Sequence, residues 1–171
     1  MPSRSSRDFS HTPEQLRQLA ADILAHAGKL GASGCETDVS EGQGQSVTVR
    51  KGEVETIEYN RDKGIGVTVY LGTRRGHAST SDFSPAALRA TVEKAATIAR
   101  FTAEDPAAGL PDAALLAKAG GPELDLFHPW TLPIEESIAL ARRCEEAAFA
   151  VSPLIDNTEG ATVSAQQSHF V

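Results

Sequence analysis

The stretch that decides the fold is VTVRKGEVETIEYNRDKGIGVTVYLGTRRG, residues Val47–Gly76. Its apolar and polar side chains alternate, and this period of two is typical of a half-buried β-strand. Glycine and asparagine interrupt the alternation, which predicts turns at Lys51–Gly52, at Asn60–Gly64 and at Gly72–Arg75. Short turns between consecutive strands indicate an antiparallel meander.

Strand-like sequence extends on both sides of this stretch, over residues 35–81. We interpret residues 35–45, CETDVSEGQGQ, as a polar strand that contains a glycine turn. Further along, Ile65, Val67, Val69 and Leu71 share one face of a strand, because side chains two positions apart point the same way. Glycine, threonine and tyrosine occupy the other face of that strand.

Three helices are expected beside the strands. Thr12 is a plausible N-cap of the first helix, proline follows it, and Gln15 completes a capping box. The dipeptide Ser84–Pro85 opens the second helix with an N-cap and a first-turn proline. Pro133 begins the third helix, in which Cys144 is expected to be a small buried residue.

The expected fold class is α+β. It combines an antiparallel meander sheet of about four to five strands, two long helices packed on one face, and a third helix with a strand pair leading to a missing C-terminal domain. We divide the chain into a disordered tail (1–11), an α+β N-terminal domain (12–104), a Pro/Gly-rich connection (105–130) and the start of a truncated region (131–171). The sequence is therefore expected to be the N-terminal piece of a longer protein.

Composition excludes several classes of function. The net charge is −7 and basic residues form only short clusters, which argues against direct nucleic-acid binding. The two cysteines lie far apart and form no metal-binding or disulfide pattern. No segment is long and apolar enough for a membrane span or a secretory signal, so we expect a cytoplasmic protein without membrane contact.

The residues themselves point to no reaction centre. None of the five histidines is followed by glutamate, and no two of them are one helical turn apart, as a helical zinc site requires. The Gly64-Ile65-Gly66 motif fails as a phosphate loop because a strand follows it. We therefore assign no catalytic residue and no metal ligand, and expect scaffold, surface and strand edges instead. An exposed edge can accept an extended peptide as an added strand.

The residues that we single out are structural or surface positions. Gly64 and Gly66 are predicted to permit backbone geometry that a side chain would spoil. Arg74 and Arg75 are candidates for contact with a partner, with a solvated hairpin tip as the alternative. Turn roles are expected for three further residues: Gly52, Asn157 and Gly160.

The whole string resembles a known family once four motifs are read in order. GEVE and GIGVTVY occur in the opening stretch, LFHP follows at residues 126–129, and NTEG follows at residues 157–160. With these motifs the chain, from about Leu16 onward, is similar to the N-terminal part of the PmbA (TldE) branch of the TldD/PmbA family. This family consists of bacterial peptidase-complex subunits.

The resemblance implies a function that the residues alone do not. Chains of the TldD and PmbA types pair into a heterodimeric metalloprotease that acts on unfolded or extended peptides. Its zinc motif, HExxxH, belongs to the TldD side, beyond the N-terminal domain, and is absent from this sequence. The family has also been called a modulator of DNA gyrase, which we take as an indirect effect.

The resemblance therefore predicts a non-catalytic subunit. It would hold no cofactor in this chain, would pair with a TldD-like protease subunit that carries zinc, and would act on extended peptides. One alternative is a peptide-binding module that uses strand addition without an obligate protease partner. Another is a chain that hydrolyses peptides alone, which would need a bound metal.

Overall fold

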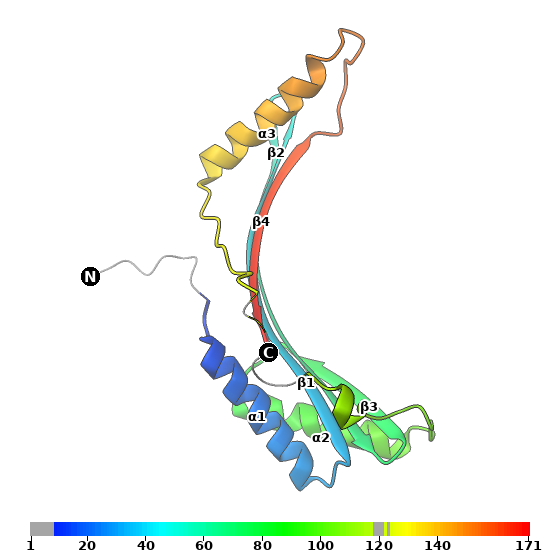
Figure 1. The fold of residues 1–171 in the computed structure, drawn as a ribbon. Coiled ribbons are helices and arrows are strands. Elements are labelled where there is room, and N and C mark those ends of the chain that lie inside the picture. The colour runs from blue at the N-terminus through cyan, green and yellow to red at the C-terminus, as the bar shows by residue number, and fades with distance from the viewer. Residues whose placement is uncertain (1–8, 118–121, 123) are drawn as a thin grey trace, which may run out of the picture. The chain divides into compact units, whose positions relative to one another are not determined.

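The computed structural model describes residues 9–117, 122 and 124–171. Most of the predicted tail, residues 1–8, and part of the predicted connection, residues 118–121 and 123, lie outside this description. The described residues form three α-helices, one short 3-10 helix and four strands (Figure 1): α1 (Pro13–Lys29), α2 (Pro85–Phe101), η1 (Ala113–Leu115), α3 (Ile134–Phe149), β1 (Gly34–Arg50), β2 (Glu53–Leu71), β3 (Arg74–Thr80) and β4 (Ala161–Phe170).

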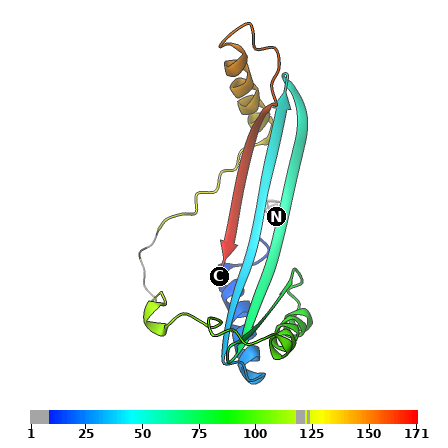
Figure 2. The ribbon, with the colours of Figure 1, turned by 90° about the vertical axis from the view of Figure 1, so that its right-hand side faces the viewer.

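The strands form one sheet in the order β3-β2-β1-β4 (Figure 2), and the expected α+β class is confirmed. Strands β2 and β3 pair antiparallel, from Ile65 opposite Thr80 to Leu71 opposite Arg74. Two of the predicted turns are present. Lys51 and Gly52 have φ angles of 51° and 78°, the pattern of a two-residue hairpin turn that matches the strand twist. Gly72, with φ of 61°, lies in the turn from β2 to β3.

Two other predicted turns are wrong. Strand β1 runs unbroken through the expected glycine turn within residues 35–45, and β2 runs unbroken through Asn60–Gly64. Within these strands glycine has a different use, which is space for neighbouring side chains. A Cβ atom at Gly44 would lie only 2.8 Å from Asn60 Oδ1 and 2.8 Å from Gln166 Cγ. Glycine inside a strand commonly marks such a close approach.

The strand pair expected after the third helix is replaced by a single strand. Among the described residues, 151–160 form turns, a bend and irregular chain, and only β4 is a strand. Strand β4 pairs with β1, which lies more than a hundred residues earlier, and therefore could not be paired from local sequence.

Contacts divide the chain into two compact units. Unit 1 comprises residues 1–41, 63–124 and 169–171, and unit 2 comprises residues 42–62 and 125–168. Strands β1 and β2 each run through both units, so that each strand has one segment in unit 1 and another in unit 2.

In unit 1 the helices α1 and α2 cover one face of the sheet. The capping box predicted for α1 is present, because Thr12 Oγ1 accepts from the Gln15 N–H at 3.2 Å and Gln15 Oε1 accepts from the Thr12 N–H at 2.8 Å. Gly76 lets α2 approach β3, because a Cβ there would overlap the α2 backbone at Ala95. The core is apolar throughout: Leu16, Ala20, Ile23, Ala27, Val39, Ile65, Val67, Val69, Ala78, Phe83, Leu88, Val92, Ala95 and Ala96.

In unit 2 the helix α3 lies along one face of the strand segments (Figure 1). Its buried cluster is small and consists of Val47, Val49 and Ala141, with four partly buried apolar side chains packed around it. The opposite face carries hydroxyl pairs instead. The Ser46 and Ser164 oxygens are 3.1 Å apart, and those of Thr48 and Thr162 are 2.9 Å apart.

Candidate interaction surfaces

The turn from β1 to β2 is held by a buried carboxylate of α3. Glu145, whose exposed fraction is only 3%, accepts the Lys51 N–H at 2.7 Å and the Gly52 N–H at 2.7 Å. Arg142 Nε donates to the Gly52 carbonyl at 2.8 Å. Gly52 therefore lies in a turn in which both its N–H and its carbonyl group are bound by α3 side chains. Sequence reasoning missed Glu145, and its only signal was an acidic residue four positions after Ala141 on the buried stripe of the helix.

Asn157 and Gly160 border the start of β4 in unit 2. Gly160 has φ of 101°, and a Cβ there would lie 2.8 Å from the Val49 carbonyl oxygen. Arg50 Nε donates to the Thr158 carbonyl at 3.0 Å, which fixes this segment against β1. Asn157 itself is exposed. The NTEG segment thus leads into β4, and glycine is needed at its last position for both conformation and space.

Gly64 and Gly66 lie inside β2 in unit 1, and the expected reason for them needs correction. Neither has φ in the left-handed region, so neither relies on special backbone geometry. Gly66 leaves space for the Asp38 carboxylate, which a Cβ there would displace. Gly64 has room for a side chain, since the nearest atom to an added Cβ is Ser40 Oγ at 3.8 Å.

Arg74 and Arg75 begin β3, and the structure brings them to different environments. Arg74 donates to the Arg100 carbonyl at 3.2 Å and to Glu104 Oε1 at 3.2 Å, so it fastens β3 to the end of α2. Arg75 is exposed and lies opposite Tyr70 across the strand pair. Arg75 is therefore the more accessible of the two candidates for contact with a partner.

Tyr70 belongs to a polar group on the face of the unit 1 sheet that α1 and α2 leave open. Its hydroxyl donates to Glu36 Oε1 at 2.8 Å. This hydrogen bond, with burial, raises the pKa of the Tyr70 hydroxyl, and the positive charge of Arg75 counteracts part of the rise. The tyrosine therefore remains a neutral donor at physiological pH.

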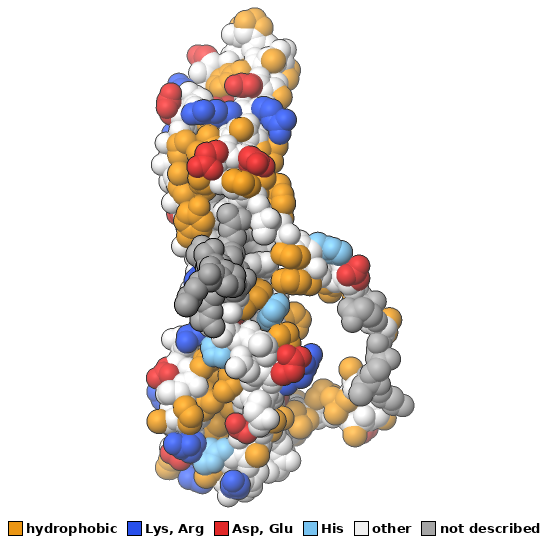
Figure 3. Space-filling model, turned by 90° about the vertical axis from the view of Figure 1, so that its left-hand side faces the viewer, with side chains coloured by type: hydrophobic (Ala, Val, Ile, Leu, Met, Phe, Trp, Pro, Cys, Tyr) orange, Lys and Arg blue, Asp and Glu red, His pale blue; other side chains and the backbone are white. Residues whose placement is uncertain are grey.

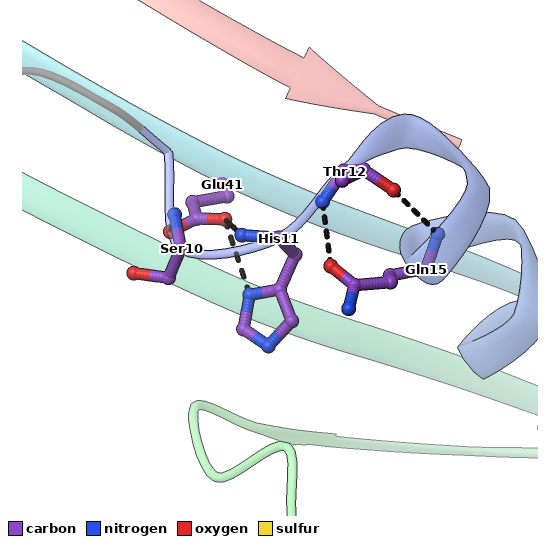
Figure 4. A network of polar contacts seen from close by, with 5 residues as sticks. All are labelled: Ser10, His11, Thr12, Gln15 and Glu41. Atoms are coloured by element: carbon purple, nitrogen blue, oxygen red, sulfur yellow. Dashed lines mark hydrogen bonds and ion pairs between the residues drawn. The ribbon is translucent and has the colours of Figure 1, made fainter.

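A second buried carboxylate, Glu41, holds the start of the described chain in unit 1 (Figure 4). Its oxygens accept the Ser10 N–H at 2.8 Å and the His11 N–H at 3.0 Å, and His11 Nδ1 lies 3.2 Å away. Burial raises the pKa of the Glu41 carboxyl, but the hydrogen bonds from Ser10 and His11 outweigh it, so the net pKa is lowered. Sequence reasoning had no signal for this contact, which joins residues about thirty positions apart.

The two outer strand segments of unit 2 differ in charge. Residues 53–62 of β2, EVETIEYNRD, carry five charged side chains, which is a common protection of an edge strand. The ten residues of β4, ATVSAQQSHF, carry no Asp, Glu, Lys or Arg and no proline. No other described strand pairs with the outer side of β4. This edge is the one better suited to accept a further strand.

Little in the described residues suggests reactive chemistry. Within residues 9–117, 122 and 124–171 there is no grouping of three or more His, Cys, Asp or Glu side chains that could hold a metal ion. Both cysteines are free, and Cys144 is exposed rather than buried as expected. None of the described helices has the length and apolar character to cross a membrane.

Comparison with known proteins decides the family. A model of the PmbA/TldA metallopeptidase domain 1 matches residues 35–99. The chain is 43% identical over 160 residues to Metalloprotease PmbA of Escherichia coli, which covers 92% of this chain and 35% of that protein. The chain belongs to the TldD/PmbA family. It is also 36% identical over 162 residues to the Haemophilus influenzae homologue of PmbA, covering 94% of this chain and 36% of the homologue.

Solved structures of TldD/PmbA-type proteins share the fold. A proposed modulator of DNA gyrase from Bacteroides thetaiotaomicron aligns with a TM-score of 0.69 at 20% identity, over 93% of this chain and 35% of that chain. TldE from Thermococcus kodakarensis aligns with a TM-score of 0.61 at 15% identity, over 90% of this chain and 34% of that chain. The chain spans about a third of the length of the curated relatives that it matches.

Proposed function

We propose that this chain forms the N-terminal domain of a PmbA/TldE-type subunit that is itself non-catalytic. The subunit would pair with a TldD-like protease subunit carrying zinc, and the complex would act on unfolded or extended peptides in the cytoplasm. The observation that carries this proposal is the 43% identity to Metalloprotease PmbA over 92% of the chain.

The domain's role in such a complex would be to supply wall and docking surface. The open face of the unit 2 sheet supports this role, because Ile57 and Tyr59 are 46% and 68% exposed there. By strand alternation these two residues share a face with Glu55, which makes an ion pair with Arg50 on the side away from α3. Aromatic and aliphatic residues on a sheet face are typical of the centre of protein interfaces.

Arg75 is proposed to contact the partner subunit at the tip of the β2–β3 hairpin. It is exposed, in contrast to Arg74, whose guanidinium already binds Glu104. The three turn residues Gly52, Asn157 and Gly160 are proposed to act indirectly, by fixing the ends of the unit 2 strands.

Co-purification tests the proposal. The chain would be co-expressed with a TldD-like subunit from the same organism, with an affinity tag on one component. We expect both polypeptides in one peak of defined mass by size-exclusion chromatography with light scattering. Arg75→Glu should weaken the complex, and Lys94→Glu, a charge reversal of another exposed residue, should leave it intact. Separate elution of the two unaltered chains at micromolar concentration would contradict the proposed pairing.

A second candidate function is a peptide-binding module that works by strand addition without an obligate protease partner. The uncharged outer edge of β4 favours it, because main-chain hydrogen bonds to such an edge need no particular peptide sequence. The two candidates separate in one experiment. The module would be supported if an extended peptide binds saturably to the chain alone and the substitution Ser164→Pro in β4 abolishes this binding. The chain should then show no association with a TldD-like chain.

A further inference from the structure

Residues that lie far apart in the sequence meet at one place in unit 1. Phe9 precedes α1, and His169 lies near the end of β4, more than a hundred positions later. Their ring centroids are 3.9 Å apart, with 32° between the ring planes. Val171 exchanges two backbone hydrogen bonds of 2.9 Å with Val39 of β1. Residues 9–11, which we call the arm, therefore contact residues 169–171, which we call the β4 end.

Strand β1 holds both of these segments. Glu41 lies two positions after Val39 and is only 7% exposed. One of its oxygens accepts the Ser10 N–H and the other accepts the His11 N–H (Figure 4). The His11 ring also lies 5.2 Å from the Phe83 ring, within the usual range for aromatic pairs. On the side of unit 1 that carries α1, Figure 3 shows histidine side chains among apolar ones.

Helix α1 does not depend on the arm for its start. Its first turn is closed by the capping box of Thr12 and Gln15, and both residues follow the arm in the sequence. A capping box satisfies two N–H groups at the start of a helix with side chains of the helix start itself. The inner face of α1 is in addition buried in the apolar core of unit 1. Detachment of the arm would therefore leave α1 folded.

We propose that the arm is a latch, which fastens the β4 end to unit 1 and opens and closes while α1 stays folded. Segments at the start of a domain are poorly ordered unless contacts tie them down. Here the two N–H groups on Glu41 and the Phe9 ring on His169 supply such contacts. In the open state water replaces the two N–H donors, so the Glu41 carboxylate stays solvated.

A latch at this place links the arm to the uncharged strand β4. A ligand that binds the arm only in its open state favours opening, and by linkage it loosens the β4 end. Conversely, a ligand that binds only when the β4 end is ordered favours the closed arm. This inference goes beyond the proposed function, because it concerns the chain alone and holds with or without a protease partner.

Amide hydrogen exchange of the chain, measured by NMR, tests the latch because each segment has its own reporters. Ser10 and His11 report on the arm, and Val39 and Val171 report on the β4 end. In Glu41→Gln the side chain has one acceptor oxygen and no charge, so it holds the arm more weakly. We expect exchange at all four amides to accelerate by about tenfold, while the amides of α1 keep their protection.

Matched variants separate the latch from general effects of substitution. Asp38→Asn makes the same change of charge on an exposed carboxylate of β1 and is the control for Glu41→Gln. Phe9→Ala removes the ring that lies on His169, and Phe101→Ala removes a ring that is 87% exposed. Phe9→Ala should accelerate exchange of the two β4-end amides as Glu41→Gln does. Both controls should leave this exchange at the wild-type rate.

Three results would overturn the proposal. Unchanged exchange at Ser10 and His11 in Glu41→Gln would show that the carboxylate does not hold the arm. Fast exchange of the arm with unchanged exchange at Val39 would show that the arm does not fasten the β4 end. Loss of protection throughout α1 in both Glu41→Gln and Phe9→Ala would show that the arm is a fixed part of the core. If one variant does not fold, the other decides.

Discussion

The two units fix helices to a sheet by different physical means. In unit 1, α1 and α2 bury a continuous apolar core in which all the clustered side chains are aliphatic or aromatic. In unit 2, α3 buries only three apolar residues completely and adds polar side chains, among them Glu145 and Ser137. Gln45 Nε2 donates to Ser137 Oγ at 3.1 Å and to the Leu132 carbonyl at 2.8 Å.

This difference predicts different responses to substitution. An apolar core is sensitive to volume, because its side chains are packed at crystal-like density. A buried polar contact is sensitive to loss of one partner, because the group left behind stays unsatisfied. Steric substitutions should therefore damage unit 1 most, and deletion of single polar groups should damage unit 2 most.

The largest effect is expected for Gly76→Val in unit 1. The new side chain would overlap the backbone of α2 at Ala95, and backbone can yield only if the helix moves off the sheet. We expect a loss of about 4 kcal/mol or more in the free energy of unfolding. Chemical denaturation monitored by circular dichroism measures it. Wild-type stability in this variant would show that α2 is not tightly packed on β3.

The second effect is expected for Glu145→Ala in unit 2. Removal of the carboxylate leaves the Lys51 and Gly52 N–H groups without their acceptor, at a cost of about 2–3 kcal/mol. Hydrogen exchange of these two amides should accelerate strongly. Glu146→Ala, at an exposed neighbouring position, is the control. Similar amide exchange in the two variants would mean that the Glu145 hydrogen bonds do not stabilise the turn.

Gly66→Ala and Gly64→Ala form a third, smaller test within β2. The Gly66 variant must displace the Asp38 carboxylate and is expected to lose about 1 kcal/mol. The Gly64 variant has free space and should be neutral or slightly stabilised, because alanine loses less backbone entropy than glycine. Thermal melting of the pair measures the difference. An equal loss of stability in both variants would support the original expectation, that both positions need backbone geometry available only to glycine, against the φ angles.

The smallest effect concerns pH and Glu41. Since its folded-state pKa is lowered, the contact stabilises the protein above the ordinary carboxyl pKa. That stability is lost as the pH falls through the lowered pKa. The difference in melting temperature between the wild type and Glu41→Gln should therefore shrink between about pH 6 and pH 3. A difference that stays constant over this range would rule out the ionised carboxylate as its source.

Local chemistry was predictable from the sequence where neighbouring residues determine it. Thr12, Pro13 and Gln15 specify the start of α1 within one turn, and the capping box is observed. Lys51–Gly52 specifies a two-residue hairpin turn through positive φ angles. Period-two alternation assigned Ile65, Val67, Val69 and Leu71 to one strand face. The first three lie in the core, and Leu71 is half-buried.

Features that depend on distant residues were not predictable. Glycine in a strand and glycine in a turn look alike in sequence, and only the position of Asn60 and Gln166 beside Gly44 shows which applies. The hydrogen bonds of Glu145 join residues more than ninety positions apart, so no local pattern reveals them. The contact between Phe9 and His169 likewise exists only once β4 lies beside β1.

Our central proposal is that this chain would supply structure and docking while a TldD-like partner would supply the zinc. The most direct test of this proposal is metal analysis of the purified chain, alone and in complex with that partner. The same two samples are assayed for hydrolysis of an unfolded peptide. We expect zinc and hydrolysis in the complex and neither in the isolated chain. Stoichiometric zinc or peptide turnover in the isolated chain would contradict the proposal.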